Sequence, residues 1–138
     1  MKPLGVLEET RVVVATDADI VAARMHGRAL ATRLGFRATD ATLIATAISE
    51  LARNILLYAK TGEVAISVIE RGERRGVAVV ASDEGPGISD AARAMEDGFS
   101  TSGRLGLGLP GVRRLMDEFE VRSAPGRGTT VTVKKWIT

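Results

Sequence analysis

The segment Asp83–Ile88, with the sequence DEGPGI, places a carboxylate and two glycines directly after an apolar run at residues 76–82. Such a run is typical of a buried strand, so Asp83 is expected at a strand end. The glycines allow a close approach of the backbone to a ligand, while Pro86 fixes the turn between them. The segment therefore indicates a strand that delivers one carboxylate into a pocket. The alternative is an ordinary turn with a solvated Asp83.

A second pair of polar residues, Glu50 and Asn54, lies four residues apart in a segment with helical periodicity. Residues at this spacing share one face of a helix. Both stand beside the apolar stripe, and Asn is a poor choice for the middle of a helix. The placement favours a functional pair over a solvated glutamate with a tolerated asparagine. Arg53 points about 100° away from Asn54 around the helix and is interpreted as a surface or partner residue.

Glycine is concentrated at residues 103–111, where four glycines fall within nine residues after a run of small hydroxyl side chains. The segment leads into a helix expected at residues 112–119, with Pro110 near the first turn. Free backbone amides and the positive end of a helix dipole make such an opening a ready phosphate site. The alternative is a flexible linker.

The remaining segments are interpreted as the elements that position these groups. Thr16–Asp17 caps a helix that ends before Gly35, and Thr39–Asp40 caps a second helix that runs to about Tyr58. The first helix carries its apolar side chains at Ile20, Val21, Met25, Ala29, Leu30 and Leu34. Strands are expected at residues 11–15 (an edge strand), 63–71, 76–83, 120–123 and 129–136, a short helix at 91–98, and a loose leader at 1–9.

These elements predict an α/β fold, a two-layer sandwich with a mixed, mostly antiparallel sheet and helices on one face. The 138 residues suit one domain, taken as residues 1–138. Trp136, the only tryptophan, is expected to pack at the sheet edge.

The composition excludes several classes of protein. The net charge is only +2, with scattered basic residues, which argues against nucleic-acid binding although the isoelectric point is about 9.4. The chain has no cysteine, so disulfides and thiolate metal sites are excluded. No apolar stretch approaches the roughly 20 residues of a membrane span, and the N-terminus does not resemble a signal peptide. A cytoplasmic location follows by default.

The chain carries four short motifs whose order resembles the ATP-binding boxes of the GHKL superfamily: Glu50-x-x-x-Asn54, Asp83-x-Gly85-x-Gly87, Gly106-Leu-Gly108 and Gly128-Thr129. This superfamily includes type II topoisomerases, Hsp90, histidine kinases and mismatch-repair ATPases, and shares the Bergerat fold. Longer stretches, such as TAISELARNILLYA and MEDGFSTSGRLGLGLPGVRRLMDEF, are similar to the RsbT-type serine/threonine protein kinases. Those are switch kinases of the bacterial stressosome and general stress response. The resemblance covers about residues 11–137.

The resemblance implies ATP and Mg²⁺ as cofactors and gives roles to the residues around them. Asp83 would accept a hydrogen bond from the adenine amine, and Glu50, the catalytic residue, would orient or deprotonate the attacking hydroxyl. Asn54 would be a ligand of Mg²⁺, and residues 89–105 would form a lid over the γ-phosphate. The ATP-binding residues implied in this way are Asn54, Asp83, Gly85, Gly87, Arg104, Gly106, Gly108, Leu109 and Thr129.

The resemblance also implies partners. The expected substrate is a serine on a STAS-domain anti-sigma-factor antagonist, in a partner-switching pathway that can include a PP2C-type phosphatase activated by direct binding. An anti-sigma factor of the RsbW and SpoIIAB type is the alternative, since those kinases carry an arginine near Arg104. A non-kinase ATP-binding module is a third reading. The apolar face of the first helix, with the N-terminal strand, could form a homodimer or could pack in the core.

Overall fold

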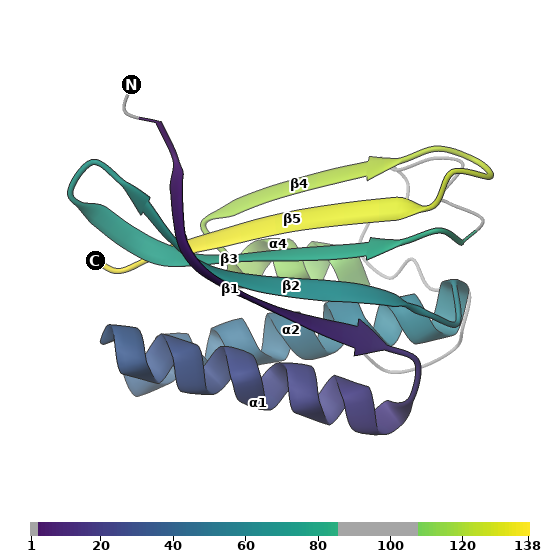
Figure 1. The fold of residues 1–138 in the computed structure, drawn as a ribbon, viewed down its shortest axis with the longest axis horizontal. Helices are drawn as coiled ribbons and strands as arrows, with labels where there is room; N and C mark the ends of the chain where they lie inside the picture. The colour runs from purple at the N-terminus through teal and green to yellow at the C-terminus, as the bar shows by residue number, and fades with distance from the viewer. Residues whose placement is uncertain (1–2, 86–107) are drawn as a thin grey trace.

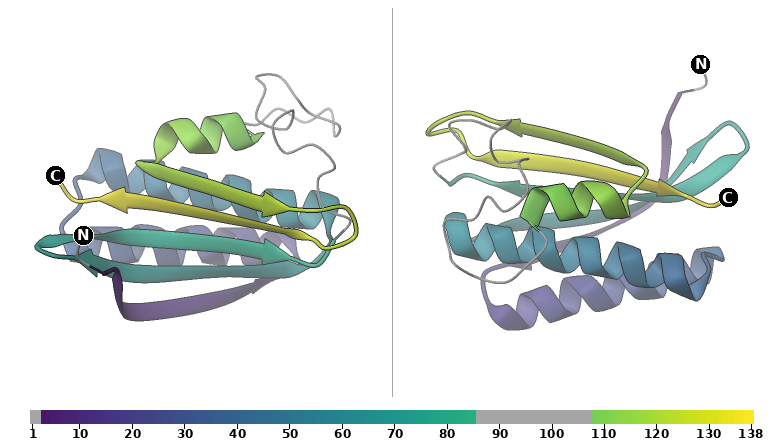
Figure 2. Two further views of the ribbon diagram at one scale, coloured as in Figure 1. Left: turned by 90° about the horizontal axis from the view of Figure 1, so that it is seen from above. Right: turned by 180° about the vertical axis from the view of Figure 1, so that it is seen from behind.

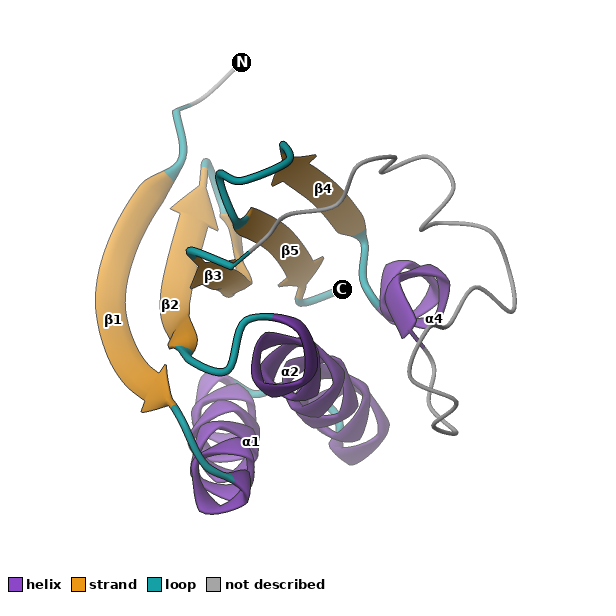
Figure 3. Ribbon diagram, turned by 90° about the vertical axis from the view of Figure 1, so that its right-hand side faces the viewer, coloured by secondary structure: helices purple, strands orange, loops and turns teal. Residues whose placement is uncertain are grey.

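The computed structural model describes residues 3–85 and 108–138, and these form two layers (Figure 1). One layer is a five-stranded sheet in the order β1-β2-β3-β5-β4, and every neighbouring pair in it is antiparallel. Helices α1, α2 and α4 form the other layer against one face of the sheet (Figure 3). The predicted two-layer α/β sandwich is therefore confirmed, with an antiparallel rather than a mixed sheet over the described residues.

The strands are β1 (Gly5–Val14), β2 (Gly62–Arg71), β3 (Arg74–Asp83), β4 (Glu118–Ser123) and β5 (Thr129–Trp136). The helices are α1 (Asp17–Leu34), α2 (Ala38–Tyr58) and α4 (Gly108–Leu115). No helix among the described residues is both long and apolar enough to cross a membrane. The predicted short helix at residues 91–98 lies outside the described residues.

The prediction of a loose leader at residues 1–9 is wrong from Gly5 onward. Strand β1 begins there and pairs with β2 along its whole length, with an irregularity between Val6 and Glu8. The residues involved are largely exposed, so their sequence lacks the alternation of a half-buried strand. Backbone pairing along the sheet edge, rather than side-chain burial, holds this segment in place.

The two long helices begin differently. At α1 the prediction is confirmed. The Thr16 hydroxyl accepts a hydrogen bond from the backbone N–H of Asp19, and the Asp19 carboxylate accepts one from the backbone N–H of Thr16. Gly35 ends the helix with a φ of 101°. At α2 the predicted cap is two residues late. The N-cap is Arg37, without a side-chain hydrogen bond, and Asp40 lies in the first turn near the positive end of the dipole.

The third helix is displaced relative to its prediction. Residues 112–119 were expected to be helical, whereas α4 covers Gly108–Leu115 and Glu118 already belongs to β4. The Asp117 side chain marks the change, because its carboxylate accepts a hydrogen bond from the backbone N–H of Trp136 at 2.8 Å. Pairing with β5 thus extends β4 into residues whose composition alone would suit a helix.

The core lies between the helices and the sheet. In α2, Ile44, Ile48 and Leu51 are almost completely buried, as predicted for its apolar stripe. Gly27 of α1 packs so closely against Ile48 that a methyl group there would overlap the Ile48 side chain. Three predicted apolar positions of α1 do not reach this core: Val21 and Met25 remain 44% and 64% exposed, and Ala29 is exposed as well.

The opposite face of the sheet, onto which the left view of Figure 2 looks, has a small cluster of its own. Trp136 is 2% exposed and packs with Ile69 and Ala78, while the guanidinium groups of Arg71 and Arg74 lie over its ring at 5.4 and 4.7 Å from the centroid. Strand β5 lies between β3 and β4, so the prediction of Trp136 at the sheet edge is wrong. Its partners come from across the sheet, which local sequence does not reveal.

Candidate functional site

Asp83 is the last residue of β3 and lies at the end of the sheet where β2 and β5 begin. Its neighbours across the sheet are Gly62 of β2 and Thr129 of β5. The side chain is half-buried, and Oδ1 accepts a hydrogen bond from the backbone N–H of Gly85 at 2.9 Å. Among the described residues this bond uses one carboxylate oxygen, so Oδ2 is free to accept a hydrogen bond from a ligand. The structure thus places a fixed carboxylate where the sequence predicted one.

Three glycines enclose the backbone of this strand end. A Cβ at Gly62 would lie 2.5 Å from the carbonyl oxygen of Ser82, and one at Gly85 would lie 2.6 Å from the Cβ of Ala59. A Cβ at Gly128, whose φ is 78°, would overlap the carbonyl oxygen of Asp83. These contacts leave no room for a side chain. They lock the β3 end against β2, α2 and the turn before β5.

Two hydroxyl groups flank the turn before β5: Ser123 ends β4, and Thr129, the partner of Asp83 across the sheet, begins β5. The Ser123 hydroxyl donates to the carbonyl oxygen of Gly128 at 3.0 Å and lies 2.8 Å from the Thr129 hydroxyl. Thr129 therefore stands where the sequence predicted support for the pocket. Sequence analysis missed Ser123; a hydroxyl at the end of the strand before a Gly-rich turn is the signal that could have indicated it.

Glu50 and Asn54 lie on α2, next to the buried residues Leu51 and Ile55, as their spacing predicted. The Glu50 side chain is only 12% exposed and forms an ion pair with Arg53, with Nη1 2.7 Å from Oε1. Asn54 is half-buried. Arg53, interpreted as a surface or partner residue, is one-third exposed, and its long side chain folds back onto Glu50, a contact that the sequence analysis did not predict.

Helix α4 begins at two of the predicted phosphate-binding residues. Gly108 has a φ of 64° and forms the first residue of the helix, and Leu109 follows it, 8% exposed, in the core. The first backbone N–H groups of a helix have no partner within it, so they can receive an anion. The other predicted residues, Gly87, Arg104 and Gly106, lie outside the described residues, as does the proposed lid at 89–105.

The described site residues gather at one end of the two layers. Gly62 would contact Ile55 of α2 if it carried a Cβ, and Gly85 lies against Ala59 at the end of the same helix. The end of α2 therefore lies against the ends of β2 and β3, and α4 packs beside α2 (Figure 3). This arrangement provides a carboxylate for an amine donor, an amide oxygen for a hard cation, an acid for proton transfer, and helix N–H groups for an anion. The donor set fits a nucleoside triphosphate with a divalent cation.

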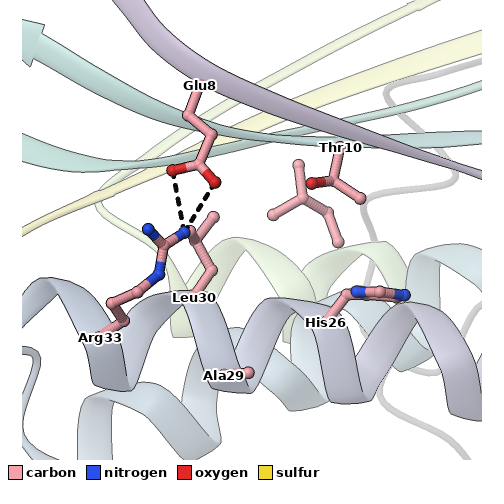
Figure 4. Close-up of a pocket in the computed structure, with 7 residues that line it drawn as sticks. Glu8, Thr10, His26, Ala29, Leu30 and Arg33 are labelled. Carbon is pink, nitrogen blue, oxygen red and sulfur yellow. Dashed lines mark hydrogen bonds and ion pairs between the residues drawn. The ribbon is translucent and has the colours of Figure 1, made fainter.

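A separate hollow of about 300 Å³ lies between β1 and α1. It is lined by Glu8, Thr10, His26, Ala29, Leu30, Arg33 and Ile66, and the Arg33 guanidinium binds both oxygens of Glu8 there (Figure 4). Because the charged groups neutralise each other, the hollow offers an ion little net attraction. None of its lining residues is a predicted site residue.

Comparison with known proteins agrees with this geometry. Residues 39–137 match the family model described as histidine kinase-, DNA gyrase B- and HSP90-like ATPase. The chain is 52% identical to the serine/threonine-protein kinase RsbT of Bacillus subtilis, over 94% of this chain and 98% of that protein. It is 37% identical to the anti-sigma F factor of a Thermoanaerobacter species, over 68% of each chain.

Two solved structures share the fold at low sequence identity. One contains the RsbU and RsbW domains of a Mycobacterium tuberculosis protein, with a TM-score of 0.62 and 19% identity, over 94% of this chain and 32% of that one. The other is the SiaB–SiaC complex of Pseudomonas aeruginosa, with a TM-score of 0.60 and 15% identity, over 96% of this chain and 91% of the matched one.

Proposed function

Because the chain belongs to the family of histidine kinase-, DNA gyrase B- and HSP90-like ATPases and, within it, to the RsbT serine/threonine-protein kinases, we propose specific roles for its site residues and partners. The chain is an ATP-dependent protein serine/threonine kinase of a partner-switching system. The observation that supports the proposed site best is the half-buried Asp83 carboxylate, held by three closely packed glycines where the last turns of α2, which carry Asn54, lie against β2 and β3.

Asp83 binds the adenine ring of ATP in this proposal. Its Oδ2 accepts a hydrogen bond from the exocyclic amine, and the backbone at Gly85 and Gly87 lets the purine lie close. Thr129 supports the same end of the pocket through its hydroxyl. The N–H groups of Gly108 and Leu109 donate to the phosphates at the start of α4. Gly106 is a further proposed N–H donor, and Arg104 is proposed to contribute a positive charge.

Asn54 is the proposed protein ligand of Mg²⁺. This ion prefers six oxygen ligands and keeps several waters, so one amide oxygen suffices when the triphosphate supplies others. When bound, the ion would neutralise negative charge on the phosphates. Asn54 is half-buried on α2, and its spacing of four residues from Glu50 supports a site that the two residues share on one helix face.

Glu50 acts as the general base. The hydroxyl oxygen of a substrate serine forms a bond to the γ-phosphorus while the bond from that phosphorus to the β,γ-bridging oxygen breaks, and ADP leaves. The hydroxyl proton passes to Oε2 of Glu50. Such proton transfer contributes roughly 10²–10⁴ in rate. The Glu50 side chain is only 12% exposed, so its carboxylate is shielded from bulk water.

The proposed protein substrate is a STAS-domain anti-sigma-factor antagonist, and a PP2C-type phosphatase is a further proposed partner. The similarity to RsbT supports the switch-kinase role, and the similarity to anti-sigma F factors supports a regulator that exchanges partners. The second candidate, an anti-sigma factor, rests on the 37% identity to that group. Copurification with a sigma factor would favour it, whereas phosphorylation of a STAS domain without sigma binding favours the kinase. A cytoplasmic location stays a prediction.

Calorimetric titration with ATP, with and without Mg²⁺, tests the proposed site. Asp83→Asn keeps the size but removes the charge, and hydrogen bonds to charged groups contribute about 1.5–3 kcal/mol, so affinity should fall about 10–100-fold. Asn54→Ala should remove the dependence on Mg²⁺. Glu50→Ala is the matched control and should bind ATP as the unaltered chain does. Equal affinity in all four proteins would refute the assignment.

A further inference from the structure

The ion pair between Arg53 and Glu50 is the feature of the site that its proposed roles leave unused. Arg53 Nη1 lies 2.7 Å from Glu50 Oε1, with the two side chains 33% and 12% exposed. The residues are three apart on α2, a spacing at which side chains can meet. Among the described residues the bond goes to one carboxylate oxygen only. The other oxygen, Oε2, is therefore held in a defined direction and stays free.

A glutamate without such a contact would rotate about three side-chain bonds, and a base that samples many directions transfers protons less efficiently. Charge-assisted hydrogen bonds are stronger and shorter than neutral ones, so this one restricts Glu50 effectively. Small losses of orientation at a reacting group have large effects on rate. The partial burial of the pair also protects it from the solvent screening that weakens exposed pairs.

We infer that Arg53 is a positioning residue: it holds Oε1 of Glu50 so that Oε2 faces the hydroxyl to be phosphorylated. This inference rests on the proposed role of Glu50 as the base. Arg53 does not touch ATP in this scheme, and its contribution passes entirely through Glu50. Removing Arg53 should slow loss of the γ-phosphate and leave ATP affinity unchanged.

The competing role for Arg53 is direct docking of the protein substrate. A side chain that is one-third exposed is accessible to a partner, so exposure does not separate the two roles. A double-mutant cycle does. If Arg53 acts through Glu50, its removal has no effect once Glu50 is gone. If it docks the substrate, its removal has the same effect in both backgrounds.

The experiment follows the γ-phosphate of radiolabelled ATP in single turnovers, first with water and then with a purified STAS-domain protein as acceptor. The variants are Arg53→Ala, Arg53→Lys, Glu50→Ala and the double variant Arg53→Ala/Glu50→Ala, with ATP affinity measured for each. Arg33→Ala is the control, because it removes an exposed arginine–glutamate pair between α1 and β1.

We expect Arg53→Ala to be slower by about tenfold with both acceptors, a fraction of the rate that a general base contributes. Arg53→Lys should restore most of the rate, because a lysine can still reach the carboxylate. The double variant should be no slower than Glu50→Ala, and Arg33→Ala should match the unaltered chain.

The outcomes separate this inference from the function on which it rests. A fast Glu50→Ala would refute the base assignment and the inference together. A slow Glu50→Ala with an unchanged Arg53→Ala would refute the inference alone. A double variant that is slower than Glu50→Ala would identify Arg53 as a docking residue instead. So would an Arg53→Ala variant that is slower with the STAS domain but not with water. Reduced ATP affinity in both Arg53 variants would likewise overturn it.

Discussion

At the scale of single residues, the position of Asp83 depends on Gly128, which lies in the turn before β5. Gly128 has a φ of 78°, and a Cβ there would overlap the Asp83 carbonyl oxygen. Gly128→Ala therefore combines backbone strain of about 1–2 kcal/mol with a clash against backbone that cannot move freely. We expect a lower thermal midpoint and an ATP affinity reduced along with it, measured by calorimetry and thermal unfolding.

Gly126 provides a matched control for this prediction. It has nearly the same φ, 75°, but an added Cβ would meet nothing within 4 Å. Gly126→Ala should show the strain alone, a loss of midpoint of about 3–8 °C for a domain of this size, with unchanged ATP affinity. Equal ATP affinities in the two variants would contradict the claim that Gly128 positions Asp83.

Residue types and spacing predicted on which elements the described candidate residues lie, but not how these residues contact one another. Asp83, Glu50 and Asn54 stand where their motifs placed them relative to the elements. The contact of Arg53 with Glu50 was not predicted, because a helical projection gives the direction of the Cα–Cβ bond, whereas an arginine can fold back over one turn. Ser123 was missed because its partners, Gly128 and Thr129, are fixed by the β4–β5 pairing.

At the scale of elements, the capping box of α1 gives a prediction about pH. The backbone N–H of Ala15, together with the hydroxyl and the N–H of Thr16, stabilises the ionised Asp19 and lowers the pKa of its carboxyl below the ordinary 3.8. The pKa is lower in the folded than in the unfolded chain. The contribution is therefore complete above about pH 5 and is lost as the pH falls through the folded pKa.

Asp19→Asn should accordingly be less stable than the unaltered chain at pH 7. The difference in the free energy of unfolding should narrow as the pH falls through the lowered pKa of the folded Asp19 carboxyl, below which the unaltered chain is protonated as well. Chemical denaturation at several pH values measures this. Asp17→Asn is the control, because it changes the same charge in the same turn but lies outside the capping box. A difference that stays constant with pH would show that the ionised carboxylate is not the stabilising form.

Elements with a clear local signal were predicted well, and those held by tertiary contacts were not. Strand β5 and the end of α1 match their predicted bounds, because alternation and a glycine after the last turn mark them. The first residues of β1, up to Glu9, were taken for part of a leader, since their exposed side chains carry no such pattern. The junction of α4 and β4 moved because pairing with β5 outweighs the helical preference of Glu118 and Phe119.

At the scale of the whole molecule, two clusters on opposite faces of one sheet can report on whether the fold is a single unit. The main core lies between the helices and one face of the sheet, whereas Trp136 packs with Ile69 and Ala78 on the other face. Trp136 is the only tryptophan, so its fluorescence reports on that face, while far-ultraviolet circular dichroism is dominated by the helices. If residues 1–138 form one domain, both signals should change at the same denaturant concentration.

Adding ATP with Mg²⁺ extends this test from the fold to the site. A ligand that binds only the folded state stabilises it, by about 2.7 kcal/mol at one hundred times its dissociation constant. For a chain of this length, that corresponds to a rise in the thermal midpoint of roughly 10 °C. The rise should appear equally in both signals, although Trp136 lies on the far face of the sheet from the helices that we propose to bind the nucleotide. The Asp83→Asn variant at the same ATP concentration should lose most of this rise in the thermal midpoint. A rise in the helical signal alone would mean that the two faces unfold separately and that residues 1–138 are not one cooperative domain.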